Sequence, residues 1–403
     1  MASRPLRSEP EAIVALLSGP GRSDVARFLT RQRWFAAKTR GVQALAVLDW
    51  AVLDPAVPLL LLLLSVDGDR YYVPIAVAGE TAPEAALVQA DGLSVVDAHD
   101  DPRFGRRLLA AIAAGRTIEG RAGRFHFQPT AGWAFPADPD ATAVRRLRGE
   151  QSNTSIVLGD LVLKSLRRPA PGLNPDLEML RFLTTKTAFP HVPRLAGSAE
   201  YEGGEEPAAL AVLQEFVPNT GDGWGHVVSA LAARGPGGAE PLITDLRRLG
   251  AITGGLHVAL ASDETDPAFR PEPVTAEDVA RWREDIGRDL RAEEVRRCLA
   301  DRAEDDPAAA ALAVLDTMPG ALSKIRLHGD YHLGQVLKTP DGFVIIDFEG
   351  EPARPLAERR RKESALRDVA GMLRSLDYAA HAVAFREPEA DRPARLAALT
   401  AWE

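Results

Sequence analysis

The C-terminal half of the chain has apolar residues at helical spacing, and a short β-hairpin is predicted within it. Thr339-Pro340-Asp341-Gly342 has the composition of a hairpin turn, so residues 335–338 should pair antiparallel with residues 343–347. This pairing brings Gln335 and Asp347 to the same end of the hairpin. Around the hairpin, apolar residues recur every three or four positions, which predicts helices over residues 242–256, 308–318 and 366–384.

Three oxygen-bearing side chains are expected at that end of the hairpin. Asp330 lies on the preceding loop, Gln335 begins the first strand and Asp347 ends the second. Magnesium binds a few protein oxygens together with substrate phosphates, and a neighbouring carboxylate can accept a hydroxyl proton during phosphoryl transfer. The sequence therefore predicts a site for Mg²⁺ and phosphate chemistry.

The order of helical and strand patterns predicts an α+β chain in three parts. Residues 1–90 read as a small α+β unit, with an amphipathic helix over 23–38 followed by a meander of strands. Residues 91–217 alternate short strands with one helix that begins near Pro175. Residues 218–403 are mostly helical, apart from the hairpin.

Composition excludes several classes of protein. The 403 residues are 46% hydrophobic, which is enough for a large core, and the formal charge of −9 argues against nucleic-acid or anionic-membrane binding. The single cysteine, Cys298, cannot form an internal disulfide and fits a reducing compartment, so we expect a cytoplasmic protein. The longest apolar run, Leu59 to Leu64, is too short to span a bilayer and predicts a buried strand, and no targeting segment is expected at the N-terminus.

Several motifs in this order resemble a known family. His328-Gly-Asp-Tyr-His-Leu-Gly-Gln335, followed by Asp347-Phe-Glu349, resembles the catalytic and metal-binding loops of the aminoglycoside-phosphotransferase branch of the protein-kinase-like fold. The longer run over 347–378 is similar to bacterial maltokinases, as are Gln32-Arg-Trp-Phe-Ala-Ala-Lys38 and Glu150-Gln-Ser-Asn-Thr-Ser155.

The resemblance implies a fold and an activity. The fold is a β-rich nucleotide-binding lobe and a helical catalytic lobe, preceded by an N-terminal cap subdomain. The activity is ATP-dependent phosphorylation of maltose at its anomeric hydroxyl, which gives maltose 1-phosphate and ADP within a trehalose-to-α-glucan route. An association with trehalose synthase belongs to the same expectation. Similar kinases continue with further helices, so part of the acceptor pocket is expected to lie beyond residue 403.

The resemblance also assigns roles to the residues of the loops. Asp330 becomes the general base that contacts the acceptor, and Gln335 and Asp347 become Mg²⁺ ligands. Glu349 either contacts a second metal ion or forms an outer hydrogen bond. His328 and His332 have the spacing of metal ligands, but without a third soft ligand nearby we expect them to form structural hydrogen bonds around Asp330.

The nucleotide half needs a cation and a phosphate-binding loop. Lys164 ends a predicted strand and is expected to bridge the α- and β-phosphates, with Glu178 on the following helix as its carboxylate partner. The loop before that strand has no glycine fingerprint, so hydroxyls and backbone amides must hold the phosphates. The residues assigned to this loop are Ser152, Asn153 and Thr154, and those of the linker whose backbone is to bind adenine are Gln214, Glu215 and Val217.

Other residues leave two interpretations open. Asp377 and Tyr378 are assigned to sugar binding, although a tyrosine in the core fits equally well. Trp34 is expected to be packed in the core, and Lys38 is expected to be exposed to solvent. The charge run over 358–362 is either a solvated face or a region that steers phosphorylated ligands. The alternative functions are a kinase for another sugar or aminosugar, and a nucleotide-binding, non-catalytic partner of a trehalose-metabolising enzyme.

Overall fold

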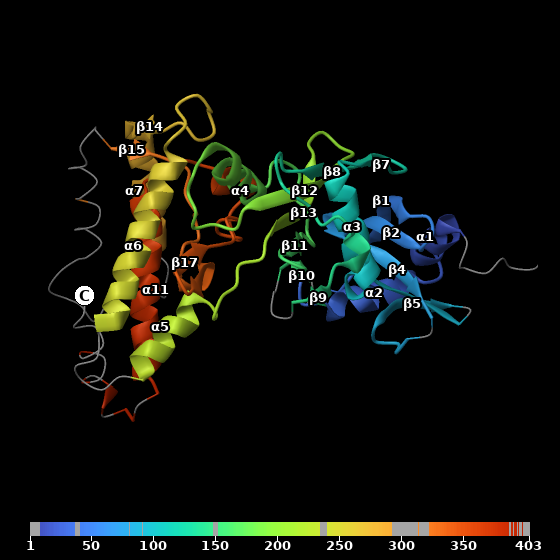
Figure 1. Cartoon of the computed structure of the whole chain (residues 1–403), viewed down its shortest axis with the longest axis horizontal. Helices are drawn as coiled ribbons and strands as arrows, with labels where there is room; N and C mark the ends of the chain where they lie inside the picture. The colour runs from blue at the N-terminus through green and yellow to red at the C-terminus, as the bar shows by residue number, and fades with distance from the viewer. Residues whose placement is uncertain are drawn as a thin grey trace, which may run out of the picture. The chain divides into compact units, whose positions relative to one another are not determined.

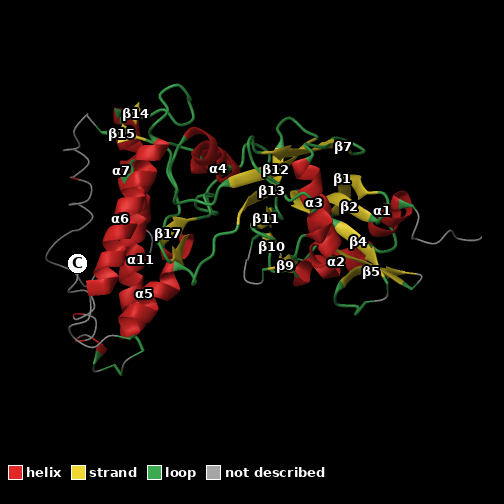
Figure 2. Ribbon diagram, in the orientation of Figure 1, coloured by secondary structure: helices red, strands yellow, loops and turns green. Residues whose placement is uncertain are grey.

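The chain folds into two compact units, shown in Figure 1 and Figure 2. The computed structural model describes residues 9–36, 41–79, 81–90, 92–147, 152–233, 240–291, 313, 322–386, 388, 389, 391, 392, 394 and 397. The first unit comprises Met1–Lys186, Pro190–Gly221 and Leu337–Glu349, and the second comprises Thr187–Phe189, Asp222–Val336 and Gly350–Glu403. The two predicted parts over residues 1–90 and 91–217 thus share one unit, and the division into three domains stays a prediction.

The first unit begins with two helices on an antiparallel sheet. The helices are α1 (Pro10–Ser18) and α2 (Arg22–Arg31), and the strands are β1 (Leu45–Asp54), β2 (Leu59–Val66), β3 (Asp69–Tyr72), β4 (Ile75–Ala78), β5 (Ala86–Ala90) and β6 (Leu93–Asp97). The sheet order is β1-β2-β4-β6-β5, and β3 pairs with β2. The predicted helix over 23–38 therefore begins one residue earlier and ends at Arg31, before Trp34 and Phe35, whose side chains are buried.

The apolar run at residues 59–64 forms β2, which is a buried strand as predicted, and both of its faces are buried. Successive side chains of a strand point to opposite faces. The even-numbered leucines pack in one core with α1 and α2, and the odd-numbered leucines pack in another core with α3 (Pro102–Ala113) and the second sheet. A strand between two cores can be apolar at every position, which explains why this run has no polar alternation.

A seven-stranded antiparallel sheet completes the first unit. Its order is β7-β8-β12-β13-β11-β10-β9. The strands are β7 (Thr117–Glu119), β8 (Arg124–Pro129), β9 (Val144–Arg146), β10 (Thr154–Leu158), β11 (Leu161–Ser165), β12 (Leu195–Glu202) and β13 (Ala208–Glu215). The helix α4 (Pro175–Lys186) begins where the sequence predicted. α3 lies so close to β10 that a Cβ on Gly105 would come within 2.8 Å of Leu158, so this glycine permits the contact.

The predicted hairpin is present, but its first strand lies one residue later than predicted, and its second strand begins one residue earlier and ends two residues earlier. Its strands are β16 (Val336–Thr339) and β17 (Gly342–Ile345). Lys338 exchanges backbone hydrogen bonds with the segment that follows β13, and the Ile345 N–H donates to His191 O at 2.8 Å. These contacts explain why residues 337–349 group with the first unit rather than with the helical half.

The second unit is helical, as predicted. Its helices are α5 (Gly223–Ala232), α6 (Glu240–Leu260), α7 (Ala276–Arg291), α10 (Leu356–Arg359) and α11 (Leu366–Ala384), with short strands β14 (Glu272–Pro273) and β15 (Ser323–Lys324). The helices predicted over 242–256 and 366–384 are confirmed as α6 and α11. The helix predicted over 308–318 lies outside the described residues except for Ala313, and so does Cys298. In the described part of the chain, no helix has the length and apolarity needed to cross a membrane; the cytoplasmic location stays a prediction.

One buried charged group joins the two sheets of the first unit. Asp97, at the end of β6, accepts a hydrogen bond from the Arg167 guanidinium at 2.5 Å, and its other oxygen lies 2.7 Å from His99 Nδ1. Burial, together with the positive charge of Arg167, lowers the pKa of His99 to about 4 despite the opposing effect of Asp97. Burial alone would raise the pKa of Asp97, but Arg167 and His99 hold it well below its usual range. His99 is therefore neutral at pH 7.

The stability of the protein should consequently fall as the pH falls from about 7 to 5. In the unfolded chain His99 takes up a proton near pH 6.5, whereas in the folded chain it does not until about pH 4. This difference should lower the free energy of unfolding by about 2 kcal/mol between pH 7 and pH 5. Denaturant unfolding of the wild type and of His99→Gln at both pH values measures it. The variant should lack this part of the pH dependence, and equal losses in the two proteins would contradict the assignment.

Candidate functional site

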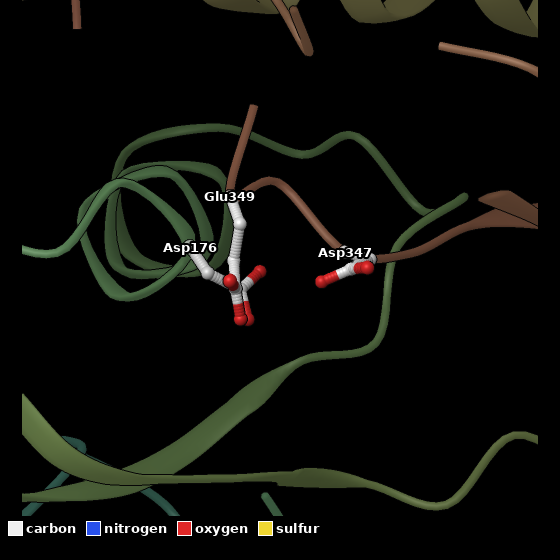
Figure 3. A group of neighbouring side chains, drawn as sticks. All are labelled: Asp176, Asp347 and Glu349. Atoms are coloured by element: carbon white, nitrogen blue, oxygen red, sulfur yellow. The ribbon is translucent and has the colours of Figure 1, made fainter. Parts of the chain in front are cut away.

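Lys164 on β11 lies among three carboxylates within the first unit. Its Nζ is 3.1 Å from Asp176 Oδ2, 2.5 Å from Asp347 Oδ1 and 2.8 Å from Glu349 Oε1. Figure 3 shows the carboxylates of Asp176 and Glu349 pointing to one place, from α4 and from the loop after β17, with that of Asp347 facing them. We call these four residues the acidic cluster.

The acidic cluster carries more negative than positive charge. Burial alone would lower the pKa of Lys164, but the three carboxylates raise it well above its usual range, so the side chain is an ammonium ion. Burial raises the pKa of Asp176, and the charges of Asp347 and Glu349 raise it further against the effect of Lys164. With all four groups ionised, two negative charges remain uncompensated. Such a site favours a divalent cation over a lone anion.

Two of the three carboxylates fit a magnesium ion. Ligand oxygens of Asp176, Asp347 and Glu349 lie within 4.8 Å of one another. The side chain of Asp176 is 1% exposed, and its two oxygens accept hydrogen bonds from Lys164 and from the Phe348 N–H. The side chains of Asp347 and Glu349 are 38% and 20% exposed. Oxygen donors of this kind suit Mg²⁺, so Asp347 and Glu349 are the residues that would hold it.

The third predicted ligand, Gln335, belongs to the second unit. It ends a short 3-10 helix, η4 (Leu333–Gln335), directly before β16, and its place in a metal site stays a prediction.

The backbone of Asp347 has an unusual conformation. Its φ is 67°, in the left-handed region that non-glycine residues seldom adopt and that costs of the order of 1 kcal/mol. The next peptide is held in place because the Phe348 N–H donates to Asp176 Oδ1 at 2.9 Å. Residues kept in such conformations by their surroundings concentrate at functional sites.

The carboxylate that α4 contributes to Lys164 is Asp176, not the predicted Glu178. Both residues are on the first turn of α4, but positions two apart on a helix point to nearly opposite sides. The side that faces β11 is the side of Asp176, which also contacts the backbone of the loop after β17. Sequence spacing alone did not give the rotation of this helix about its axis.

A cavity of about 370 Å³ opens beside the acidic cluster. All of its lining residues belong to the first unit. The predicted residues that line it are Ser152, Asn153, Lys164, Gln214, Glu215, Val217 and Asp347, joined by Asp176, Ser155, Val162 and Phe216 among others. Residues predicted separately for a phosphate loop, a lysine strand, a linker and a metal site therefore share one cavity.

Thr154 does not line this cavity, in contrast to the prediction. Its hydroxyl accepts a hydrogen bond from Arg167 Nε at 2.8 Å, on the opposite face of β10. Because side chains alternate along a strand, the next residue, Ser155, lines the cavity. Ser155 on β10 pairs with Lys164 on β11. The residue of this strand that lines the cavity is therefore Ser155 rather than Thr154.

The predicted linker presents a backbone edge to the cavity. The Glu215 N–H donates to Arg194 O at 2.9 Å and the Phe216 N–H to Asp160 O at 2.8 Å. The Val217 carbonyl accepts a hydrogen bond from the Asn219 side chain at 2.8 Å. Within the described part of the chain the Val217 N–H donates to no acceptor, which leaves it available to a planar, hydrogen-bonding ligand.

In the second unit, a buried carboxylate of α11 binds the backbone of the loop that carries Asp330. Asp368 of α11 is 2% exposed and accepts hydrogen bonds from the His328 and Gly329 N–H groups, both at 3.0 Å, and from His257 Nε2 at 3.1 Å. Burial would raise the pKa of Asp368, but His257 and His328 hold it below its usual range. Asp368 thus holds the backbone of the two residues that precede Asp330.

The two histidines of this loop have structural hydrogen bonds. His328 Nδ1 accepts from the Asp330 N–H at 3.4 Å, and His332 Nδ1 accepts from the Gly334 N–H at 3.0 Å. α11 packs against the same loop, where a Cβ on Gly371 would lie 2.6 Å from Tyr331 O. The structural role predicted for both histidines agrees with these bonds.

The remaining predicted residues have varied positions. Tyr378 is 59% exposed, so the interpretation of it as a core residue is wrong. Asp377 Oδ1 lies 3.4 Å from His381 Nδ1. The contact of Asp377 and Tyr378 with a sugar stays a prediction. Trp34 is packed as expected, and Lys38 lies outside the described residues. The run over 358–362 is not wholly solvated, since Lys362 is 8% exposed and bonded to Glu272.

Comparison with known sequences identifies the family. The model of the phosphotransferase enzyme family matches residues 143–350, more than half of the chain. The chain is a member of the phosphotransferase enzyme family. The model of the maltokinase N-terminal cap domain matches residues 28–101, ahead of the phosphotransferase match.

This phosphotransferase is similar to glucosamine kinases. It is 31% identical over 273 residues to that of Streptacidiphilus jiangxiensis, covering 64% of this chain and 59% of that one, and 30% identical over 255 residues to that of Mycolicibacterium smegmatis, covering 60% and 61%. The chain thus matches about three fifths of the length of these curated relatives. A solved glucosamine kinase in complex with glucosamine, ADP and inorganic phosphate has a TM-score of 0.63 at 25% identity, covering 94% of this chain and 85% of that one. The fold is the predicted α+β, protein-kinase-like fold with an N-terminal cap.

Removal of the ammonium should destabilise the acidic cluster. Lys164→Met leaves three neighbouring carboxylates without their shared cation, and breaking a buried ion pair in this way costs about 3–5 kcal/mol. Denaturant unfolding at pH 7 with EDTA should show this loss, and millimolar Mg²⁺ should stabilise the variant more than the wild type. Lys186→Met, at the exposed end of α4, should change the unfolding free energy by less than about 0.5 kcal/mol. Equal stabilities of the two variants would contradict the cluster.

Proposed function

We propose that this phosphotransferase is an ATP-dependent kinase that phosphorylates a sugar or aminosugar hydroxyl. The proposal rests on the acidic cluster, of which Lys164, Asp176 and Asp347 line the cavity. A nucleoside triphosphate requires a cation, carboxylates that can hold a metal ion, and backbone groups for its base. Here β11 supplies the cation, and the carboxylates and the linker backbone lie along the same cavity. The solved relative is a complex with glucosamine, ADP and inorganic phosphate, which supports a nucleotide as a ligand of this chain.

Each part of the site has a separate task in this proposal. The Val217 N–H and the linker backbone bind the adenine edge, Ser152, Asn153 and Ser155 face the phosphates, and the Lys164 ammonium pairs with phosphate oxygens. Asp347 and Glu349 would hold Mg²⁺, which, when bound, supplies positive charge to the transferring group. Lys164 must then exchange part of its contact with the carboxylates for contact with phosphate.

The acceptor hydroxyl needs a base, and we assign this role to Asp330. Its carboxylate would accept the hydroxyl proton as the oxygen attacks the γ-phosphorus and the bond to the β-phosphate oxygen breaks, giving a sugar phosphate and ADP. Asp368 holds the two preceding N–H groups, so Asp330 needs little rearrangement to act. A non-catalytic partner would have no use for a base on a loop fixed in this way.

Two acceptors are supported by different observations. The curated relatives and the solved relative are glucosamine kinases, which favours glucosamine. The maltokinase cap domain favours maltose, with phosphorylation at the anomeric hydroxyl to give maltose 1-phosphate, and an association with trehalose synthase would follow from that acceptor.

Replacement of Asp330 tests the mechanism. Asp330→Asn should lower kcat by about 10²- to 10⁴-fold, because the amide cannot accept the hydroxyl proton, while Mg²⁺-ATP affinity stays within about threefold. Asp341→Asn, on the exposed turn of the hairpin, is the matched control and should retain full turnover. ADP release is followed with glucosamine, maltose, glucose and no sugar, and phosphorus NMR identifies the phosphorylated position. Near wild-type turnover by Asp330→Asn would remove the base assignment; ATP binding without turnover of any sugar would favour a non-catalytic partner.

A further inference from the structure

Arg167 is a completely buried arginine three residues beyond Lys164. Its side chain is 0% exposed, and it follows the last residue of β11, Ser165, by two positions. A buried guanidinium requires a partner of opposite charge, because desolvation of the ion is otherwise too costly. The partner of Arg167 is Asp97, which belongs to the segment matched as the cap domain.

The contacts of Arg167 connect the cap to both β10 and β11, the antiparallel pair that we call the lysine hairpin. Nη2 donates to Asp97 Oδ2 at 2.5 Å, and Nε donates to the hydroxyl of Thr154 at 2.8 Å. The backbone takes part too, since the Tyr72 N–H at the end of β3 donates to Arg167 O at 2.9 Å. The guanidinium also lies 4.7 Å from the ring of Trp34, a second cap residue.

These contacts act at the end of the hairpin that bears the nucleotide site. Thr154 pairs with Ser165, and Ser155 pairs with Lys164, so the pair held by Arg167 is adjacent to the pair that reaches the cavity. Thr154 also follows Asn153 directly, whose Nδ2 donates to Glu349 Oε1 at 2.8 Å. A shift of Thr154 would therefore move Ser155, Asn153 and the neighbourhood of Lys164 together.

The cap holds Asp97 firmly enough to serve as an anchor. Its carboxylate is 3% exposed, and Oδ1 accepts the His99 N–H at 3.1 Å in addition to the contact with His99 Nδ1. Both oxygens are thus engaged, one within the cap and one on Arg167. The position of the guanidinium is consequently set by the backbone of the cap.

We propose that Arg167 is a positioning residue through which the cap domain holds β10 and β11 in the arrangement that binds nucleotide. This inference rests on the proposed function, because it concerns the affinity of the same cavity. Neither Arg167 nor Asp97 lines the cavity. The cap therefore acts on the nucleotide site without touching the ligand.

A second buried carboxylate of the cap provides a matched control. Asp49 on β1 is 1% exposed and accepts hydrogen bonds from Tyr201 OH at 2.8 Å and from the Arg121 and Ala122 N–H groups at 2.6 and 3.0 Å. It contacts β12 and the turn between β7 and β8, which lie on the far side of β13 from β11 in the sheet. Asp49 thus joins cap and sheet as Asp97 does, but away from the lysine hairpin.

Calorimetric titration with Mg²⁺-ADP compares Asp97→Asn with Asp49→Asn, at a temperature where circular dichroism shows both to be folded. Both variants should have lower thermal midpoints than the wild type. Only Asp97→Asn should bind Mg²⁺-ADP at least tenfold more weakly, with Asp49→Asn within about threefold of the wild type. Equal affinities in the two variants would overturn the proposal. A wild type that binds no Mg²⁺-ADP would instead overturn the proposed function.

A double variant separates positioning from loss of stability. Asp97→Asn alone leaves a buried unpaired guanidinium, whereas Asp97→Asn with Arg167→Gln removes both charges. The double variant should regain thermal stability yet keep the weak affinity, because the contact with the hairpin is still missing. Affinity that returns together with stability would show a merely structural role. Should Asp97→Asn not fold, Arg167→Lys takes its place: it keeps the charge beside Asp97 but loses the Nε contact with Thr154, and wild-type affinity in it would contradict the proposal.

Discussion

The ammonium of Lys164 is the interaction on which the rest of the site depends. It draws together carboxylates from α4 and from the loop after β17, which are distant in sequence from each other and from β11. Without that cation, three carboxylates at this separation would repel one another, and the loop that carries Asp347 and Glu349 would lose the ion pairs that join it to β11. The same excess of negative charge makes the cluster suitable for a divalent cation and unsuitable for a lone phosphate.

The first unit places this cluster by packing two sheets around shared cores. β2 is buried on both faces, so the cap and the seven-stranded sheet are parts of one compact unit. Polar contacts then fix the position of the cap on this sheet at two places. Asp97 makes one contact near the lysine hairpin, and Asp49 makes the other beyond β13. Burial of apolar surface supplies the stability of this arrangement, whereas the two buried carboxylates supply its geometry.

Much of this organisation was predictable because it follows from local patterns. The two helices of the second half, the hairpin, the buried strand at residues 59–64 and the lysine at a strand end all have periodicities or turns that a single sequence reveals. The errors have one physical origin. Choosing Glu178 over Asp176, and Thr154 over Ser155, required knowing which side of a helix or strand faces its neighbour, and this orientation comes from tertiary packing. The anchor Asp368, far along the chain from Asp330, and the left-handed backbone of Asp347 left no local signal either.

Because its negative charges outnumber its positive charge, the acidic cluster should bind nucleotide only together with a divalent cation. Titration calorimetry of the wild-type protein with ATP, in millimolar Mg²⁺ and in EDTA at the same ionic strength, tests it most directly. Binding should be at least tenfold weaker in EDTA, because two uncompensated carboxylate charges then face the triphosphate. Equal affinity in the two buffers would contradict it, since the phosphates would then be held by groups other than this cluster.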